Sequence, residues 1–133
     1  MKCACKSGRT YADCCKPFHV GVSAPNALAL MRSRYSAYAL SLHAYIMRTT
    51  HPLGPNVQTD SNLWRREIEL FCKNTDFRDL KILDMREDGD IAHVTFLATL
   101  FQGSQDVSFI EESLFEKVEG KWLYKSGQHK IST

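Results

Sequence analysis

The apolar residues in the first half of the chain recur with the spacing of an α-helix. From residue 26 onward they follow one another at alternating steps of three and four, which places them on one helical face. Ser23 and Pro25 suit the start of this helix, and the pattern predicts a break at Ser41–His43 and an end at His51–Pro55. The residues on the predicted face are Leu28, Met31, Tyr35, Tyr38, Leu42 and Tyr45.

A second helix is predicted from Asp60 or Ser61 to Lys73. Its apolar residues are Leu63, Trp64, Ile68, Phe71 and Cys72. Cys72 is the one cysteine in the second half of the chain, and we expect it to be a small buried apolar side chain on this helix.

After residue 76 the helical period gives way to the alternation of β-strands, interrupted by short turn sequences. The expected strands are residues 80–85, 91–101, 107–118 and 122–124, with turns at 87–90, 102–105 and 119–121. Strands joined by such short turns form an antiparallel meander. Because helices precede the strands, the pattern predicts an α+β sandwich in which the helices pack on one face of a four-strand sheet.

The composition is that of a globular protein with one main core and a small additional segment. The chain has 133 residues, of which 44% are apolar and 24% charged. No apolar run approaches the roughly 18 residues of a membrane helix. The first residues are polar and lack the apolar stretch of a secretory signal, so we expect a cytoplasmic protein with reduced thiols and no membrane partner.

Four of the five cysteines lie between residues 3 and 15, which favours a metal site over a disulfide framework. Zinc prefers four thiolates in a tetrahedral arrangement, and so short a segment can take its folding free energy from the metal. Ser7–Gly8 provides a sharp turn, and the Tyr11 ring can cover the metal. The expected zinc ligands are Cys3, Cys5, Cys14 and Cys15.

The cysteines allow three other interpretations. Four unligated thiols are improbable in so small a segment, and neither C-x-C nor C-C is the usual C-x-x-C redox arrangement. His19 is near enough in sequence to replace one cysteine as a ligand, although the four sulfurs already complete a zinc site.

The spacing Cys3-x-Cys5-x-Ser7-Gly8-x-x-Tyr11-x-x-Cys14-Cys15 resembles the SEC-C motif, the zinc knuckle at the C-terminus of the SecA translocation ATPase. That family commonly has glycine where this chain has Lys6. Residues 30–38, 50–52, 112–115 and 120–124 resemble the bacterial YchJ family, UPF0225, whose activity is uncharacterised. The resemblance implies a zinc knuckle over residues 1–20 and an NTF2-like domain over residues 21–133, a cone of helices against a curved sheet.

If the helices and the sheet enclose a cavity, its polar lining can be guessed from the sequence. The candidates are Arg34, His51, Trp64, Glu112 and Trp122. Each also has a structural interpretation. Arg34 and Glu112 can form an ion pair between helix and sheet, since strand alternation places Glu112 with Ile110 and Leu114 on one face. His51 can serve in a loop, and the two tryptophans can be core residues.

Three functions follow from these features. The first is protein docking through the knuckle, because the similar SecA knuckle binds other proteins and this one carries Lys2, Lys6, Arg9 and Lys16. The second is an enzyme of the isomerase, dehydratase or hydrolase type, with a small ligand in the cavity. The third is weak nucleic-acid binding. The formal charge of +2 falls to about zero once four thiolates hold one Zn²⁺, which disfavours the third function.

Overall fold

Helices precede an antiparallel sheet in the computed structural model, which describes residues 1–130. The predicted main unit extends to residue 133, so its last three residues lie outside the described part. Among residues 1–130, no helix has both the length and the apolar character needed to cross a membrane. The main helices are α2 (Ala27–Ala39), α3 (His43–Arg48) and α4 (Ser61–Asn74); the strands are β1 (Asp76–Asp88), β2 (Ile91–Gln102), β3 (Gln105–Asp106), β4 (Phe109–Val118) and β5 (Lys121–Lys130).

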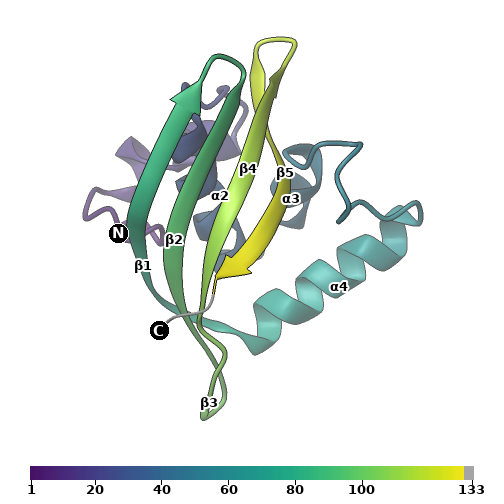
Figure 1. Cartoon of the computed structure of the whole chain (residues 1–133). Coiled ribbons are helices and arrows are strands. Elements are labelled where there is room, and N and C mark those ends of the chain that lie inside the picture. The colour runs from purple at the N-terminus through teal and green to yellow at the C-terminus, as the bar shows by residue number, and fades with distance from the viewer. Residues whose placement is uncertain (131–133) are drawn as a thin grey trace.

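The sheet has the order β1-β2-β4-β5, and the two-residue strand β3 pairs with the end of β2. This is the predicted meander with one short additional strand. Irregularities in the pairing occur twice along β1 and once between β4 and β5, and such bulges bend a sheet. Figure 1 shows the result: a twisted, curved sheet with α2 and α3 behind one of its faces and α4 set at an angle beside β5.

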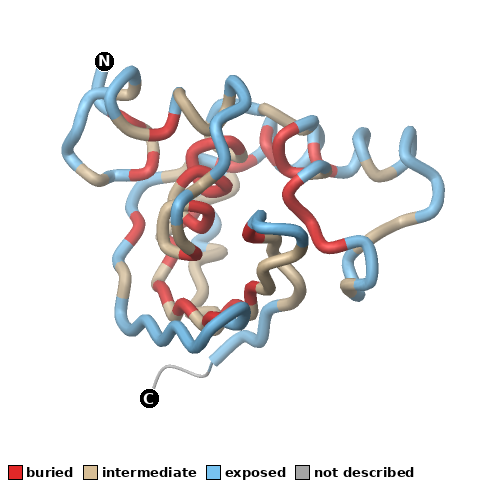
Figure 2. The backbone as a smooth tube through the Cα atoms, turned by 90° about the horizontal axis from the view of Figure 1, so that it is seen from above, coloured by how far each residue is buried: buried red, intermediate tan, exposed pale blue. Residues whose placement is uncertain are grey.

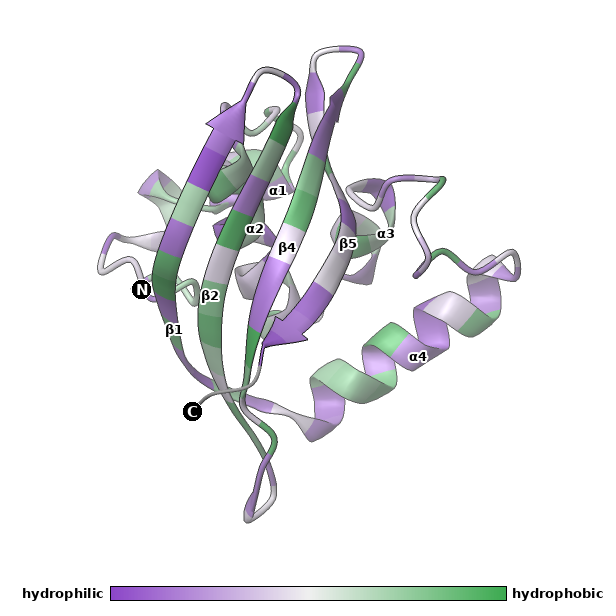
Figure 3. Ribbon diagram, in the orientation of Figure 1, coloured by the Kyte–Doolittle hydropathy of each residue, from purple (hydrophilic) through white to green (hydrophobic). Residues whose placement is uncertain are grey.

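The core lies between α2 and the inner face of the sheet. Alternate residues of β2 are buried, as the sequence pattern predicts, and they contact the apolar residues of α2. Figure 2 shows buried positions concentrated in the helical coil and at intervals along the strands, and Figure 3 shows hydrophobic and hydrophilic residues succeeding one another within the strands. The buried β2 residues are Ala92, Val94, Phe96, Ala98 and Leu100.

Local signals explain the bounds of the helices. The Asn26 side chain accepts a hydrogen bond from the Ala29 amide and caps α2, and Asp60 caps α4 in the same way. The helical region breaks near the predicted place, because Ser41 adopts a left-handed φ of 60° between α2 and α3. Cys72 is buried on α4, as expected.

The greatest difference from the expected elements is the length of β5. The sequence predicts a strand over residues 122–124, whereas β5 continues to Lys130. Residues 125–130 are polar or glycine and carry no apolar alternation. They remain in the sheet because residues 126–130 pair with β4 through the backbone, from Leu114 back to Ile110, with Lys125 at the irregularity between them and Tyr124.

Candidate functional site

The four clustered cysteines bring their sulfur atoms together at the N-terminal end of the molecule. All four Sγ atoms lie within 4.8 Å of one another. The Sγ of Cys14 is 3.6 Å from that of Cys5 and 3.9 Å from that of Cys15. A tetrahedral zinc with Zn–S bonds of about 2.3 Å requires S–S separations of about 3.8 Å. The sulfur positions therefore fit one tetrahedral metal ion.

A tight hairpin supplies the first two sulfurs. Lys2 and Thr10 form an antiparallel bridge, and the Cys3 amide donates to the Arg9 carbonyl at 2.8 Å. The turn between them needs left-handed backbone at Lys6, with φ 66°, and at Gly8, with φ 88°. Lysine at such a position is strained and glycine is not, which explains why glycine is common at this place in SEC-C motifs.

The second pair of sulfurs lies between two short helical segments. Cys14 follows the 3-10 helix η1 (Tyr11–Asp13), and Cys15 precedes α1 (Lys16–His19). A hydrogen bond from the Cys15 thiol lowers the pKa of Cys5 to about 4, while the same bond raises the pKa of Cys15. The cluster therefore already favours a thiolate, the form of cysteine that binds metals.

His19 is not placed as a substitute metal ligand, because both of its ring nitrogens have other partners. Its Nε2 lies 2.8 Å from the Ser33 carbonyl oxygen, which can only accept, so Nε2 carries the proton. Its Nδ1 then accepts from the Tyr11 hydroxyl at 2.7 Å. Burial lowers the pKa of His19 and favours this neutral form. With both ring nitrogens in use, His19 connects the cysteine segment to α2 instead of joining the sulfurs.

Two arginines strengthen this connection. Arg32 of α2 donates from Nη1 to the Cys5 carbonyl at 3.1 Å. Arg48, the last residue of α3, donates from Nη2 to the carbonyls of Phe18 and His19 at 3.1 and 3.3 Å. The cysteine segment is thus held on the helices by hydrogen bonds to its backbone.

A cavity of about 470 Å³ lies between the helices and the inner face of the sheet. Arg34, which is 7% exposed, borders it. Its Nη1 donates to the Ile46 carbonyl at 3.0 Å and to the hydroxyls of Thr49 and Thr50 at 2.7 and 3.2 Å. These bonds fix one edge of the guanidinium to α3 and the residues that follow it.

Glu111 of β4 supplies a carboxylate on the sheet side of the cavity, which sequence reasoning missed, and Glu67 of α4 also borders the cavity. The Oε2 of Glu111 accepts from the hydroxyls of Ser113 and Tyr124. Gly127 of β5 makes room for this arrangement, since a Cβ at that position would overlap the Glu111 carboxylate and the Tyr124 hydroxyl. A glycine inside a strand often marks a place where another group closely approaches the backbone. Gly127, in the polar segment before His129, was thus the signal in the sequence for the approach of Glu111.

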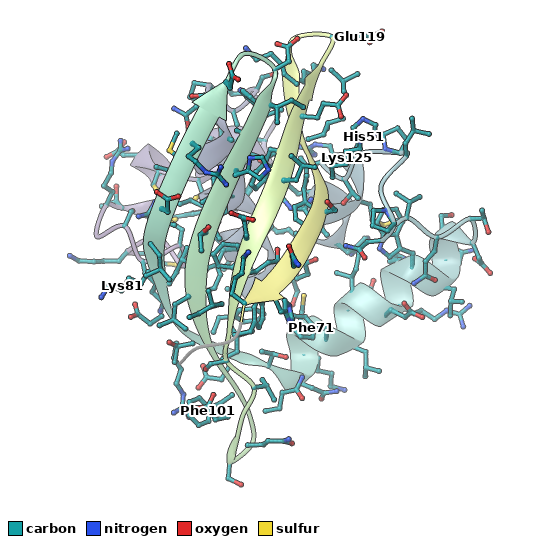
Figure 4. The ribbon with its side chains drawn as sticks, in the orientation of Figure 1. His51, Phe71, Lys81, Phe101, Glu119 and Lys125 are labelled. Atoms are coloured by element: carbon teal, nitrogen blue, oxygen red, sulfur yellow. The ribbon has the colours of Figure 1, made fainter. Side chains whose placement is uncertain are left out.

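The structure places two of the five sequence-predicted pocket residues, Arg34 and Trp64, on the wall of the cavity. His51 lies outside it: its amide donates to the Tyr124 carbonyl, and its Nε2 is 3.7 Å from Glu116. Figure 4 shows His51 beside Lys125, which also pairs with Glu116. Trp122 is 4% exposed in the main core and does not border the cavity.

Glu112 also lies outside the cavity, and the expected ion pair with Arg34 is wrong. Glu112 pairs with Arg86 at 2.9 Å and with Lys130 at 3.5 Å on the face of the sheet away from the helices. Loss of hydration raises the pKa of Glu112, but the charges of Lys130 and Arg86 together outweigh this effect, so that the pKa is lowered overall. The strand has the predicted alternation, but the inward residues are Glu111 and Ser113 instead of their neighbours.

This arrangement predicts that Arg34 and Glu112 act independently. Arg34→Met removes three hydrogen bonds from a buried cation and should lower the free energy of unfolding by about 3 kcal/mol or more. Glu112→Gln removes solvent-screened ion pairs and should change it little. Urea denaturation of both single variants and the double variant should give additive effects. If the double variant loses less free energy of unfolding than the two single variants together, the two side chains interact and the prediction is wrong.

Comparisons with known proteins agree with both parts of the chain. A family model described as the middle NTF2-like domain of YchJ matches residues 26–127. A UPF0225 protein of Sodalis glossinidius is 38% identical over 132 residues, covering 96% of this chain and 82% of the relative. A UPF0225 protein of Deinococcus radiodurans is 39% identical, and the match covers 92% of this chain and 85% of the relative.

Solved structures show the same fold. A SEC-C motif containing protein from Rhodopseudomonas palustris has a TM-score of 0.83 at 36% identity, covering 98% of this chain and all of its own. Another SEC-C motif containing protein, from Psychrobacter arcticus, has a TM-score of 0.75 at 27% identity, and the match covers 96% of this chain and 77% of the other. A putative ketosteroid isomerase from Shewanella frigidimarina shares the fold alone. It is 12% identical, with a TM-score of 0.60, and the match covers 76% of this chain and 91% of its own. The chain therefore belongs to the UPF0225 family, in which a YchJ-type NTF2-like domain accompanies a SEC-C cysteine motif.

Proposed function

We propose that residues 1–20 bind one zinc ion through Cys3, Cys5, Cys14 and Cys15, and that this knuckle docks onto an acidic segment of another protein. The observation that carries the metal assignment is the mutual approach of four sulfurs within 4.8 Å in a segment with almost no apolar core. The zinc would hold the hairpin and the two helical segments together. The Tyr11 ring, packed against the cysteines, would shield it from water on one side.

The docking surface is the exposed polar part of the knuckle. Lys2, Lys6, Arg9 and Lys16 are all exposed, and Asp13 is the one acidic residue among the first twenty. The charge of zinc with four thiolates is −2, so the basic side chains leave the knuckle slightly positive. Met1 and Val20 of the same segment are exposed by 82% and 72%, Val22 just after it by 58%, and these side chains offer apolar contacts. This combination suits an acidic protein segment with some apolar residues better than a nucleic acid.

The zinc assignment predicts one zinc per chain in protein purified without chelator, measured by elemental analysis. Changing Cys3 and Cys14 together to Ser should reduce the zinc content to background, because each pair of ligands loses one sulfur. Cys72→Ser is the matched control, since Cys72 lies on α4 away from the cluster, and it should keep one zinc. Stoichiometric zinc in the double variant, or none in the parent chain, would contradict the four-cysteine site.

The docking proposal predicts that charge reversal on the knuckle removes a partner that the unaltered chain captures. The test compares zinc-loaded parent protein, the variant Lys6→Glu/Arg9→Glu/Lys16→Glu, and the control Lys81→Glu/Lys121→Glu. The control residues are exposed lysines of β1 and β5, remote in sequence from the knuckle. Affinity capture with mass spectrometry should give a protein held by parent and control, lost from the knuckle variant and eluted by salt.

Two results would count against docking through the knuckle. One is an identical set of captured proteins for the parent and the knuckle variant. The other is equal loss from the knuckle variant and the control, which would show a general effect of charge. Zinc analysis of the knuckle variant separates these results from loss of the metal, because none of its altered residues is a ligand.

A further inference from the structure

Arg34 brings a full positive charge to the wall of a mostly apolar cavity. Its Nη1 is occupied by three acceptors, but Nε and Nη2 have no hydrogen-bond partner among residues 1–130. No carboxylate of the described chain lies within ion-pair distance of it. In the same residues, the one fully enclosed side-chain nitrogen or oxygen without a hydrogen-bond partner is Trp122 Nε1. Nε and Nη2 of Arg34 are therefore not fully enclosed, and they are accessible from the cavity that Arg34 borders.

The carboxylate on the sheet side of the same cavity does not satisfy these donors. Glu111 accepts from Ser113 and Tyr124 on Oε2, and its Oε1 lies 3.5 Å from His129 Nε2. The ring of Tyr124 also contacts Arg34, whose Cζ lies 4.6 Å from the ring centroid. Glu111 is thus supplied with donors from the protein itself, whereas Arg34 lacks an acceptor for two of its nitrogens. A bound anion would supply that acceptor.

Tyr38 offers a second donor beside this position. It borders the cavity, and its hydroxyl oxygen interacts with the Arg34 side chain, which leaves its proton available for another acceptor. Burial raises the pKa of Tyr38, although Arg34 nearby acts in the opposite direction. The phenol accordingly keeps its proton near neutral pH and can donate it to an anion. Arg34 and Tyr38 lie four residues apart on α2, one turn of the helix.

Much of the remaining lining of the cavity is aromatic. Trp64, Phe71, Phe77, Phe96 and Phe109 all border the cavity, from α4 and from three strands. The volume of about 470 Å³ lies within the range of small-molecule sites, which is about 300–1,000 Å³. Aromatic walls favour a ligand with a flat apolar body, since rings gain from offset or edge contacts beyond the area that they bury.

Charge balance limits the ligand to one negative group. Arg34 is the one basic residue among the described residues that line the cavity, and its acidic residues are Glu111 and the exposed Glu67, neither of which pairs with it. A single anion beside Arg34 therefore meets one unsatisfied cation. A phosphate or a dicarboxylate would place a second negative charge in a cavity that already contains the Glu111 carboxylate, which is unfavourable in a poorly solvated space.

We propose that this cavity is a binding site for a small aromatic monocarboxylate. Its carboxylate accepts hydrogen bonds from Nε and Nη2 of Arg34 and from the Tyr38 hydroxyl, and its ring packs between α4 and the sheet. The site is separate from the cysteine cluster, which is held on the helices by Arg32, Arg48 and His19 and shares no residue with the cavity lining. This proposal does not rest on zinc binding or on docking.

The test compares acids with their neutral amides by titration calorimetry on the unaltered chain. The probes are 3-phenylpropionate and 4-phenylbutyrate, each against the corresponding amide of the same shape. Because hydrogen bonds to a charged group are stronger than neutral ones, at least one acid should bind roughly 10–100-fold more tightly than its amide. Equal affinity of acid and amide, or no binding of either acid at millimolar concentration, would overturn the proposal.

Variants locate the bound acid. Ala98→Leu adds bulk to a residue that borders the cavity and should weaken binding at least tenfold. Thr99→Leu is the matched control, because the next residue of β2 points to the other face and does not border the cavity. Arg34→Met and Tyr38→Phe should both reduce the preference for acid over amide. If Arg34→Met does not fold, the comparison of acid with amide and the Tyr38→Phe variant still test whether the cavity binds the acid. Unchanged affinity in Ala98→Leu would place the acid elsewhere and overturn the proposal.

Discussion

The rest of the structure depends on the hydrogen bonds of the buried polar side chains on α2. Ser33, Arg34 and Ser36 are each at most 7% exposed, and a buried polar group without a partner would destabilise the fold. Ser33 bonds to the Tyr45 hydroxyl of α3 at 2.6 Å, and its carbonyl accepts from His19 of the cysteine segment. Arg34 bonds to the end of α3 and contacts the ring of Tyr124 in β5. These contacts determine where the cysteine segment, α3 and the edge of the sheet lie.

Helix α2 therefore lies between the cysteine cluster and the cavity. Arg32 and Arg34 are two residues apart, about 200° around the helix axis, so they cannot share a face. Arg32 donates to the backbone of the cysteine segment, while Arg34 borders the cavity inside the sheet. One helix thus presents one arginine to each site. This explains why α2 is buried around most of its circumference, where an ordinary surface helix buries a single stripe.

Periodicity and motif spacing predicted the helices, the meander and the grouping of the four cysteines. The orientation of β4 could not be predicted in the same way, because both of its faces contain apolar residues. Ile110 and Leu114 made the face of Glu112 look internal, yet the internal residues include Glu111 and Ser113, which are polar because they border the cavity. Sites for ligands break the binary pattern that identifies a core, so a sequence argument fails there first. His19 was equally hidden, since its partners come from residues 11 and 33 and only the fold brings them together.

The central claim is that the cysteine segment is stabilised by its own metal and is attached to a domain that folds without it. Amide hydrogen exchange of the zinc-loaded protein, before and after a chelator is added, tests this most directly. The account predicts that protection is lost over residues 1–20 and retained along β1, β2, β4 and β5, whose hydrogen bonds and core do not involve the cysteines. Loss of protection throughout residues 80–124 on chelation would contradict it, because it would make the metal part of the main core.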